Sequence, residues 1–170
     1  MTEYRPIILI DTREQLPLTF RCESRRETLP VGDYGLESFS DWQCPRFIVE
    51  RKSLDDLCQS LGRGRRRFMR EIEKMRQFSF AAIVIEGVPE QIELAQYRSR
   101  IPPTSVFGTL DAIAVRTGIH VCWCGSPDGA ARQIESYARQ FQGGVERDYL
   151  RLTGRIDSKW AKPRKATHHD

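Results

Sequence analysis

Two segments predict a β-hairpin at the centre of the fold, Val31-Gly-Asp-Tyr-Gly35 and Arg46-Phe-Ile-Val-Glu-Arg-Lys52. The second segment has the apolar, β-branched core typical of a strand, and the polar connection over residues 38–45 contains a proline. Two strands joined in this way pair side by side in opposite directions. The hairpin therefore brings Asp33, on the first segment, close to Glu50 on the second.

The second segment carries both acidic and basic side chains. Because successive residues of a strand point to opposite faces, Glu50 and Lys52 share one face and Arg51 points the other way. The carboxylates of Asp33 and Glu50 repel each other unless a cation lies between them, and hard divalent cations prefer such oxygen ligands. The pattern predicts a Mg²⁺ or Mn²⁺ site, with Lys52 placed to orient a water molecule or to stabilise charge on a phosphate oxygen.

The reaction that suits this set of residues is the hydrolysis of a phosphodiester. A competing interpretation is a surface salt bridge between Glu50 and Lys52, which would contribute under about 1 kcal/mol to stability. Asp11, at the end of an apolar run, is likewise either a turn or capping acid or a further member of the site. Asp56 follows Ser53 by three residues, a spacing that also suits helix capping.

Strands and helices alternate along the rest of the chain. Continuous apolar runs predict buried strands, and residues that recur at helical spacing or follow a Ser or Pro start signal predict helices. The predicted strands, besides the hairpin, are 7–10, 81–85 and 119–123, and the predicted helices are 53–61, one through Phe68, Ile72 and Met75, 103–117 and 127–141. This order predicts an α/β fold with a central mixed β-sheet flanked by α-helices on both faces.

Composition is typical of one soluble globular domain. The chain has 170 residues, of which 39% are hydrophobic and 29% charged, and this balance argues against a disordered or fibrous protein. No apolar run approaches the roughly 20 residues that cross a bilayer, and the amino terminus lacks the pattern of a secretion signal. Five cysteines without a pairing framework predict free thiols. We expect a cytoplasmic protein of prokaryotic or viral origin, or a nuclear protein if the source is eukaryotic, and no membrane contact.

Positive charge is concentrated in one part of the chain. The net charge of the whole sequence is +4, whereas residues 61–76 contain seven cations and two acids, a net charge of +5. Clustered arginines suit contacts to a phosphate backbone, although a solvated helix face would have the same composition. The predicted DNA-binding residues are Arg63, Arg65, Arg66 and Arg67.

Three ordered motifs give the chain a family resemblance. They are Asp11-Thr-Arg-Glu14, Gly32-Asp-Tyr34 and Glu50-Arg-Lys-Ser-Leu-Asp-Asp56, and the segments Leu61-Gly-Arg-Gly-Arg-Arg-Arg-Phe68 and Ile83-Val-Ile-Glu-Gly87 follow them in the expected places. Together they resemble the XPF-type structure-specific endonuclease family over roughly residues 6–141. The resemblance implies a restriction-endonuclease-like core, dependence on Mg²⁺ or Mn²⁺, cleavage of DNA near branches, flaps or junctions, and dimerisation through the nuclease domain.

The resemblance also implies roles for single residues. The metal ligands would be Asp11, Asp33 and Glu50, and Lys52 would be the catalytic lysine. Arg51 belongs to the same catalytic signature, and the supporting residues would be Arg13, Glu14 and Asp56. On this basis residues 1–142 form the nuclease domain, and 143–170 form a basic, flexible C-terminal extension.

The chain departs from the family pattern in two ways. Relatives of this type commonly carry tandem helix-hairpin-helix modules that grip duplex DNA, and the sequence after Phe141 is too short to supply them. The connection that contains Trp42 and Cys44 is also longer than expected. Two alternatives to a self-sufficient nuclease follow: a non-catalytic DNA-binding or scaffold domain, or a catalytic subunit that needs a partner protein or a homodimer to hold DNA.

Overall fold

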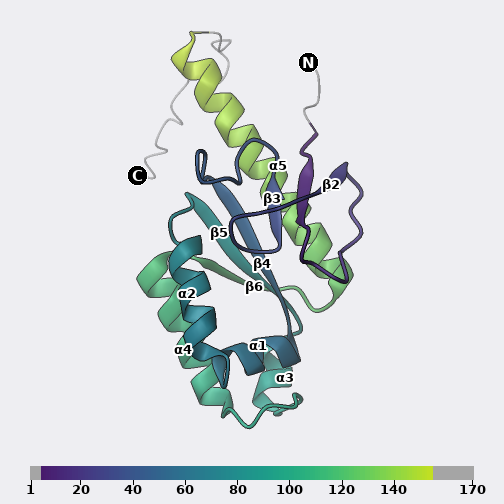
Figure 1. The fold of residues 1–170 in the computed structure, drawn as a ribbon, viewed down its shortest axis with the longest axis vertical. Helices are drawn as coiled ribbons and strands as arrows, with labels where there is room; N and C mark the ends of the chain where they lie inside the picture. Colours follow the sequence, from purple (N-terminus) through teal and green to yellow (C-terminus); the bar gives the residue numbers. More distant parts are fainter. Residues whose placement is uncertain (1–4, 155–170) are drawn as a thin grey trace, which may run out of the picture.

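The structure, a computed structural model, describes residues 5–154, which contain a six-stranded mixed sheet with helices on both faces (Figure 1). The strands are β1 (Ile8–Asp11), β2 (Ser24–Glu27), β3 (Tyr34–Leu36), β4 (Phe47–Ser53), β5 (Phe80–Glu86) and β6 (His120–Trp123), in the spatial order β2-β1-β3-β4-β5-β6. The helices are α1 (Leu54–Leu61), α2 (Arg65–Met75), α3 (Pro89–Glu93), α4 (Pro103–Thr117) and α5 (Pro127–Leu152). The predicted fold class is confirmed.

The predicted hairpin is present as β3 and β4. The two strands pair antiparallel, with Tyr34 opposite Val49, and β3 also pairs antiparallel with β1. On the other side of β4, the parallel strands β5 and β6 complete the sheet. In the described sheet, β3 is therefore antiparallel to both of its neighbours and the other strand pairs are parallel, and the hairpin places β3 and β4 at the centre.

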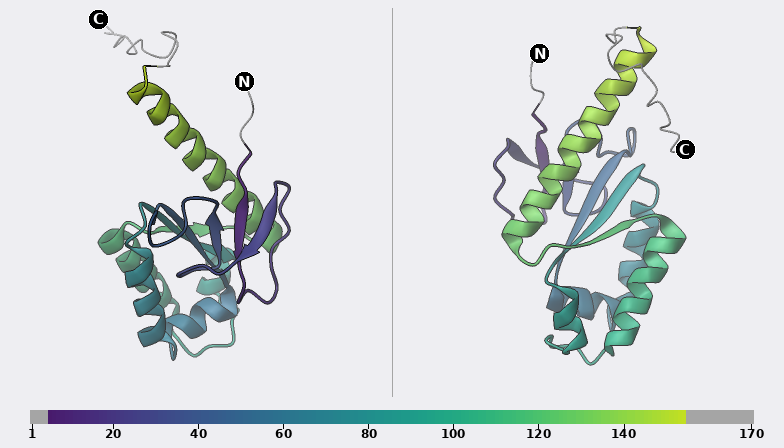
Figure 2. Two further views of the ribbon diagram at one scale, coloured as in Figure 1. Left: turned by 45° about the horizontal axis from the view of Figure 1, so that its top comes forward. Right: turned by 180° about the vertical axis from the view of Figure 1, so that it is seen from behind.

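The central strands are buried on both faces because their side chains alternate between two cores. Ile48 packs into the core beneath α1, α2 and α4, whereas Phe47 and Val49 pack into the core beneath α5. Each of these three side chains is fully buried, and a buried side chain of this size contributes about 1.5–3 kcal/mol by leaving water. Figure 2 shows α5 crossing one face of the sheet, with α2 and α4 on the other.

The helix ends follow the predicted signals. The Ser53 hydroxyl accepts a hydrogen bond from the Asp56 backbone N–H at the start of α1, and Ser126 does the same for Gly129 at the start of α5. Helix α4 ends at Gly118, which adopts the left-handed conformation that favours glycine. Local capping thus sets where three predicted elements begin or end.

Two elements lie outside the predicted pattern, and one helix is longer than predicted. Strand β2 is exposed along its whole length and has no apolar residue, while α3 spans only five residues. Helix α5 continues through Gly143 and Gly144 to Leu152, so the predicted end near Phe141 is wrong. The rest of the proposed C-terminal extension, residues 155–170, lies outside the described residues.

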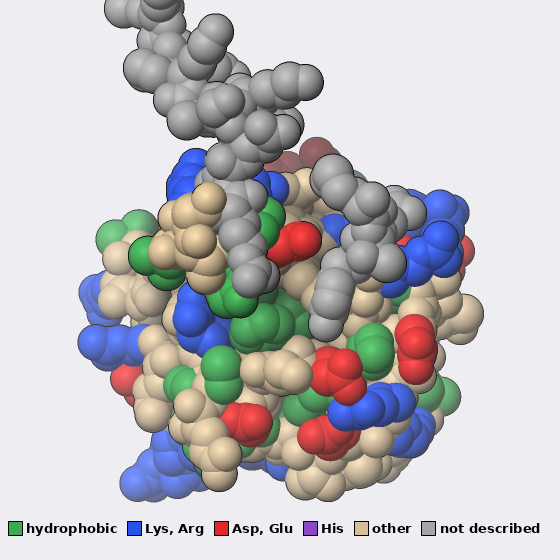
Figure 3. All heavy atoms as spheres, turned by 90° about the horizontal axis from the view of Figure 1, so that it is seen from above, with side chains coloured by type: hydrophobic (Ala, Val, Ile, Leu, Met, Phe, Trp, Pro, Cys, Tyr) green, Lys and Arg blue, Asp and Glu red, His purple; other side chains and the backbone are tan. Residues whose placement is uncertain are grey.

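Figure 3 views the molecule from the end remote from α1 and α3. On the visible surface, Lys and Arg side chains are mixed with Asp and Glu side chains around a hydrophobic patch. All five cysteines lie in the described part of the chain and are free thiols, as predicted. None of the helices in residues 5–154 is both long and apolar enough to span a membrane.

Candidate active site

Three acidic residues lie on the side of the sheet that contains the carboxyl ends of β1 and β4. Both strands are antiparallel to β3, so they run in the same direction and their carboxyl ends lie at the same edge. Asp11 is the last residue of β1, Glu50 is the middle residue of β4, and Asp33 directly precedes β3. The strand order therefore gathers three acids that are far apart in the sequence.

Gly32 allows Asp33 to lie directly against β4. Its φ of +72° is unfavourable for other residues, and a Cβ at this position would lie 2.9 Å from Ile48 Cγ1. The Asp33 backbone N–H donates to the Val49 carbonyl at 2.9 Å, and the Asp33 carbonyl accepts from the Asp11 N–H at 2.8 Å. The Asp33 carboxylate accepts from the Arg51 backbone N–H at 2.8 Å, which fixes the side chain beside β4.

Glu50 and Lys52 form an ion pair on one face of β4, as the strand period predicted. Lys52 Nζ lies 2.7 Å from Glu50 Oε1, and the two side chains are 15% and 8% exposed. Lys52 Nζ also lies 5.1 Å from the centre of the Phe68 ring, so α2 supports the lysine from the other side. At this degree of burial the pair is not the solvated surface salt bridge of the competing interpretation.

The burial of these groups changes their protonation. Burial and the neighbouring Glu50 raise the pKa of Asp33 to about 8. Burial also raises the pKa of Glu50, although Lys52 opposes this shift. Burial alone would lower the pKa of Lys52, but Glu50 outweighs it and the lysine pKa is raised. One cation thus faces two carboxylates, and the site favours additional positive charge.

Asp11 lies at the same edge but has its own partners. Its carboxylate accepts hydrogen bonds from Arg13 Nε at 2.6 Å, Arg13 Nη2 at 3.0 Å and the Leu29 backbone N–H at 2.8 Å. Burial works to raise the pKa of Asp11, but these hydrogen bonds outweigh it and hold the pKa below its usual value. Asp11 is therefore a charged anchor for the loop after β1.

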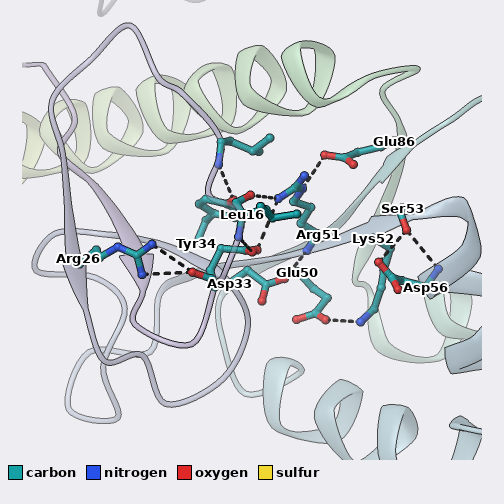
Figure 4. Close-up of polar contacts among 12 residues, drawn as sticks. Leu16, Arg26, Asp33, Tyr34, Glu50, Arg51, Lys52, Ser53, Asp56 and Glu86 are labelled. Carbon is teal, nitrogen blue, oxygen red and sulfur yellow. Dashed lines mark hydrogen bonds and ion pairs between the residues drawn. The ribbon is translucent and has the colours of Figure 1, made fainter.

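Arg51 points away from Glu50 and Lys52 (Figure 4). Its guanidinium lies 2.5 Å from Glu86 Oε1 and 3.6 Å from Glu14 Oε2, and it donates to the Leu16 carbonyl. These contacts tie β4 to the end of β5 and to the loop after β1. Arg51 and Glu14 thus belong to a second polar cluster, on the opposite face of β4 from the Glu50–Lys52 pair.

Glu86 belongs to this second cluster and was not among the predicted site residues. Its side chain is only 8% exposed, and its partner Arg51 lies 35 positions away in the sequence. The signal that could have identified it is an acid at the end of a buried apolar strand. Parallel pairing of β4 with β5 places this acid beside the Glu-Arg-Lys segment.

The other predicted residues lie further along the chain. Asp56 holds the start of α1, since its backbone N–H and its carboxylate both lie within hydrogen-bonding distance of the Ser53 hydroxyl. The four predicted DNA-binding arginines are all exposed, in the α1–α2 turn and the first turn of α2. Arg65 donates to Thr109 Oγ1 at 2.9 Å, and Arg67 pairs with Glu71 at 3.3 Å.

The donor set of Asp33 and Glu50 fits a hard divalent cation. Both are oxygen ligands, both are held in place by β4, and their mutual repulsion is relieved when a cation binds. Within residues 5–154 no three His, Cys, Asp or Glu side chains already converge as a complete metal-binding group. The Asp11 carboxylate accepts hydrogen bonds from Arg13 and Leu29. Two carboxylates, with water and substrate phosphate as further ligands, are a usual arrangement for Mg²⁺.

Known proteins share both the sequence pattern and the fold. The model of the ERCC4 domain matches residues 10–137. XPF from Aeropyrum pernix in complex with DNA is 27% identical in sequence with a TM-score of 0.62, and the match covers 82% of this chain and 66% of that one. XPF from Aeropyrum pernix in a second structure is 26% identical with a TM-score of 0.64, covering 95% and 69%. No curated protein sequence matches the chain.

Proposed function

The chain belongs to the ERCC4 domain family and has the fold of an XPF-type nuclease domain, and from this premise we propose that it is a DNA endonuclease dependent on Mg²⁺ or Mn²⁺. It hydrolyses phosphodiester bonds at branched, flap or junction DNA. The observation that carries the proposal is the buried pair of carboxylates, Asp33 and Glu50, facing the single cation Lys52.

Asp33 and Glu50 are the proposed metal ligands. A bound divalent ion would lower the pKa of a coordinated water and neutralise charge on a phosphate oxygen. The raised pKa of Asp33 means that the site gives up a proton when it takes up the ion. Asp11, with its carboxylate held by Arg13, supports the site by fixing the end of β1 beside Asp33.

Lys52 is the proposed catalytic lysine. Its ammonium group is held between Glu50 and the Phe68 ring, and its raised pKa keeps it charged at neutral pH. A fixed positive charge beside the reacting phosphate orients the attacking water and stabilises the charge that develops on the phosphate oxygens. Because the charge is held in place before the substrate arrives, it needs little reorganisation during the reaction.

DNA is the proposed partner, held by the exposed arginines Arg63, Arg65, Arg66 and Arg67. A homodimer or a partner protein would extend the contact with DNA. The exposed surface of α4 includes the apolar side chain of Val115, which is 85% exposed and could contribute to such an interface. The chain spans 66% of the length of the DNA-bound XPF structure.

A cleavage assay tests the proposal. Labelled single-stranded, duplex, flap and forked DNA are incubated with Mg²⁺, with Mn²⁺ and with a chelator, using wild type, Asp33→Ala and Lys52→Ala. Asp111→Ala and Lys74→Ala serve as matched controls, since each removes an exposed side chain of the same charge from α4 or α2. We expect metal-dependent cleavage that is lost only in the two site variants.

Binding of DNA without cleavage under every condition would contradict catalysis and favour the scaffold alternative. A second readout makes the metal test independent of activity. Mg²⁺ should raise the melting temperature of the wild type and of both controls, and it should have no such effect on Asp33→Ala. A shift that is the same in all variants would argue against Asp33 as a ligand.

A further inference from the structure

A groove with a volume of about 1130 Å³ begins beside the candidate catalytic strand. Ser53, the residue directly after Lys52, is part of its lining. One wall is formed by α1 and the α1–α2 turn, and the other by residues 98–105, which lead from α3 into α4. In Figure 1 these segments lie together at the lower end of the molecule.

Four arginines face this groove from its two walls. Arg63 and Arg65 belong to the first wall, and Arg98 and Arg100 belong to the second. Among the described residues, no acidic side chain lies within ion-pair distance of Arg63, Arg65 or Arg100, whereas Arg98 Nε lies 3.4 Å from Asp55 Oδ2. Asp55 and Asp56 also line the groove, so its lining holds four arginines and two acids, a net charge of +2 (4 minus 2).

The second wall is held in place by hydrogen bonds. The Arg98 backbone N–H donates to Asp55 Oδ1 at 2.8 Å, which ties this loop to α1. The Tyr97 hydroxyl donates to the Ile101 carbonyl at 2.7 Å, which closes the loop on itself. The Arg98 side chain nevertheless remains 93% exposed. An ordered backbone with exposed cationic side chains binds an anion with a smaller loss of entropy than a flexible loop would.

The lining indicates which part of a nucleic acid would occupy the groove. Arginine, serine and glutamine side chains donate hydrogen bonds to phosphate oxygens, and all three types line it. None of the lining residues is aromatic, whereas sites for single-stranded DNA rely on aromatic rings that stack on the bases. The groove therefore suits the backbone of a duplex.

We propose that the groove between the α1–α2 turn and residues 98–105 binds the phosphodiester backbone of a duplex arm of the DNA substrate. Arg98 and Arg100 are binding residues on the wall opposite Arg63 and Arg65. This inference rests on the proposed function, since it assumes that DNA is the substrate. It specifies the path by which the DNA reaches the site, because a duplex arm in this groove approaches the catalytic strand beside Lys52.

The test is a binding measurement in chelator, where metal-dependent cleavage cannot occur. Fluorescence anisotropy gives the affinity of Arg98→Gln/Arg100→Gln for duplex and for single-stranded DNA of equal length across a salt titration. The matched control is Arg116→Gln/Arg132→Gln, which removes two exposed arginines from the far end of α4 and from α5. Circular dichroism checks that both variants fold as the wild type does.

We expect the duplex affinity of Arg98→Gln/Arg100→Gln to fall by about tenfold, and the salt slope to decrease by about 2, because each lost phosphate contact removes about 0.9 from that slope. The control should retain the wild-type slope. An unchanged duplex slope, or a loss confined to single-stranded DNA, overturns the inference. Cleavage is measured separately: a wild type that never cleaves contradicts the proposed function, yet a specific loss of duplex binding would still support the groove.

Discussion

The two faces of β4 at the Glu50-Arg51-Lys52 segment hold similar ion pairs in different surroundings. On one face, Lys52 Nζ lies 2.7 Å from Glu50 Oε1, and the second carboxylate, Asp33, also attracts the same ammonium group. On the other face, Arg51 lies 2.5 Å from Glu86 and has Glu14 and the Leu16 carbonyl as further partners.

This difference separates a face with uncompensated negative charge from a face whose charges are paired. Arginine has several donors in a rigid fork, so one guanidinium can satisfy acceptors from three segments at once. Lysine is a point charge, and Lys52 leaves part of the negative charge of Asp33 and Glu50 without compensation. We infer that the Arg51 face stabilises the fold and that the Lys52 face is held ready for a metal ion and a phosphate.

The largest effect should come from Asp33→Asn, which keeps the shape of the side chain and removes its charge. We expect cleavage to fall on the order of 10³-fold, because a proposed metal ligand is lost. The metal-free protein should become more stable by about 1–2 kcal/mol at neutral pH, since Asn is always neutral, whereas the buried Asp33 must take up a proton on folding. Single-turnover cleavage and urea unfolding measure the two effects. A stable variant that still cleaves would remove the distinction between the two faces.

Arg51→Met should have the opposite effects, with a large loss of stability and a small loss of cleavage. It leaves Glu86 and Glu14 without their cation in a largely buried setting, so we expect a loss of about 3 kcal/mol in the free energy of unfolding. Cleavage under conditions where the variant is folded should fall much less than in Asp33→Asn. Adding Glu86→Gln to Arg51→Met should recover part of the lost stability. If Arg51→Met abolished cleavage without destabilising the protein, Arg51 would belong with the catalytic residues.

The pH dependence of stability should sharpen the contrast. The pKa of Asp33 is raised from 3.8 to about 8, so its contribution to stability is complete below about pH 4 and is lost as the pH rises toward 8. Mg²⁺ requires the charged form, so it should raise the melting temperature more near pH 8 than near pH 6. Thermal unfolding with and without Mg²⁺ measures this. Asp33→Asn is the control, and an equal Mg²⁺ effect at both pH values would contradict the assignment.

The sequence was informative where one local rule governs a position. The apolar run Ile7–Ile10 predicts a buried strand, and the strand period puts Glu50 and Lys52 on one face. Strand β2, Ser-Arg-Arg-Glu, gives no such signal because it is a fully exposed edge strand that only its pairing with β1 defines. Helix α5 passes through Gly143 and Gly144. Each glycine destabilises a helix by only about 1 kcal/mol, and extending an established helix is easier than starting a new one, so the two glycines do not end α5.

The site was less accessible from the sequence than the fold was. The motifs and the strand period predicted Asp33, Glu50 and Lys52 as one group, and the hairpin does bring them together. The occupation of Asp11 by Arg13 and Leu29, and the pairing of Arg51 with Glu86, depend on contacts between distant segments. The hydrophobic pattern within a single segment cannot predict such long-range contacts.

The smallest predicted effect separates capping from catalysis at the start of α1. Ser53→Ala removes the hydroxyl that accepts the Asp56 N–H, and we expect it to cost about 1 kcal/mol in the free energy of unfolding. Asp56→Asn keeps the backbone N–H and a polar side chain near that hydroxyl, so it should change stability by less and leave cleavage within about twofold of wild type. Urea unfolding and single-turnover cleavage of both variants provide the measurement. A large loss of cleavage in Asp56→Asn with unchanged stability would move Asp56 from the helix cap into the catalytic machinery, and the Lys52 face would then extend beyond β4 into α1.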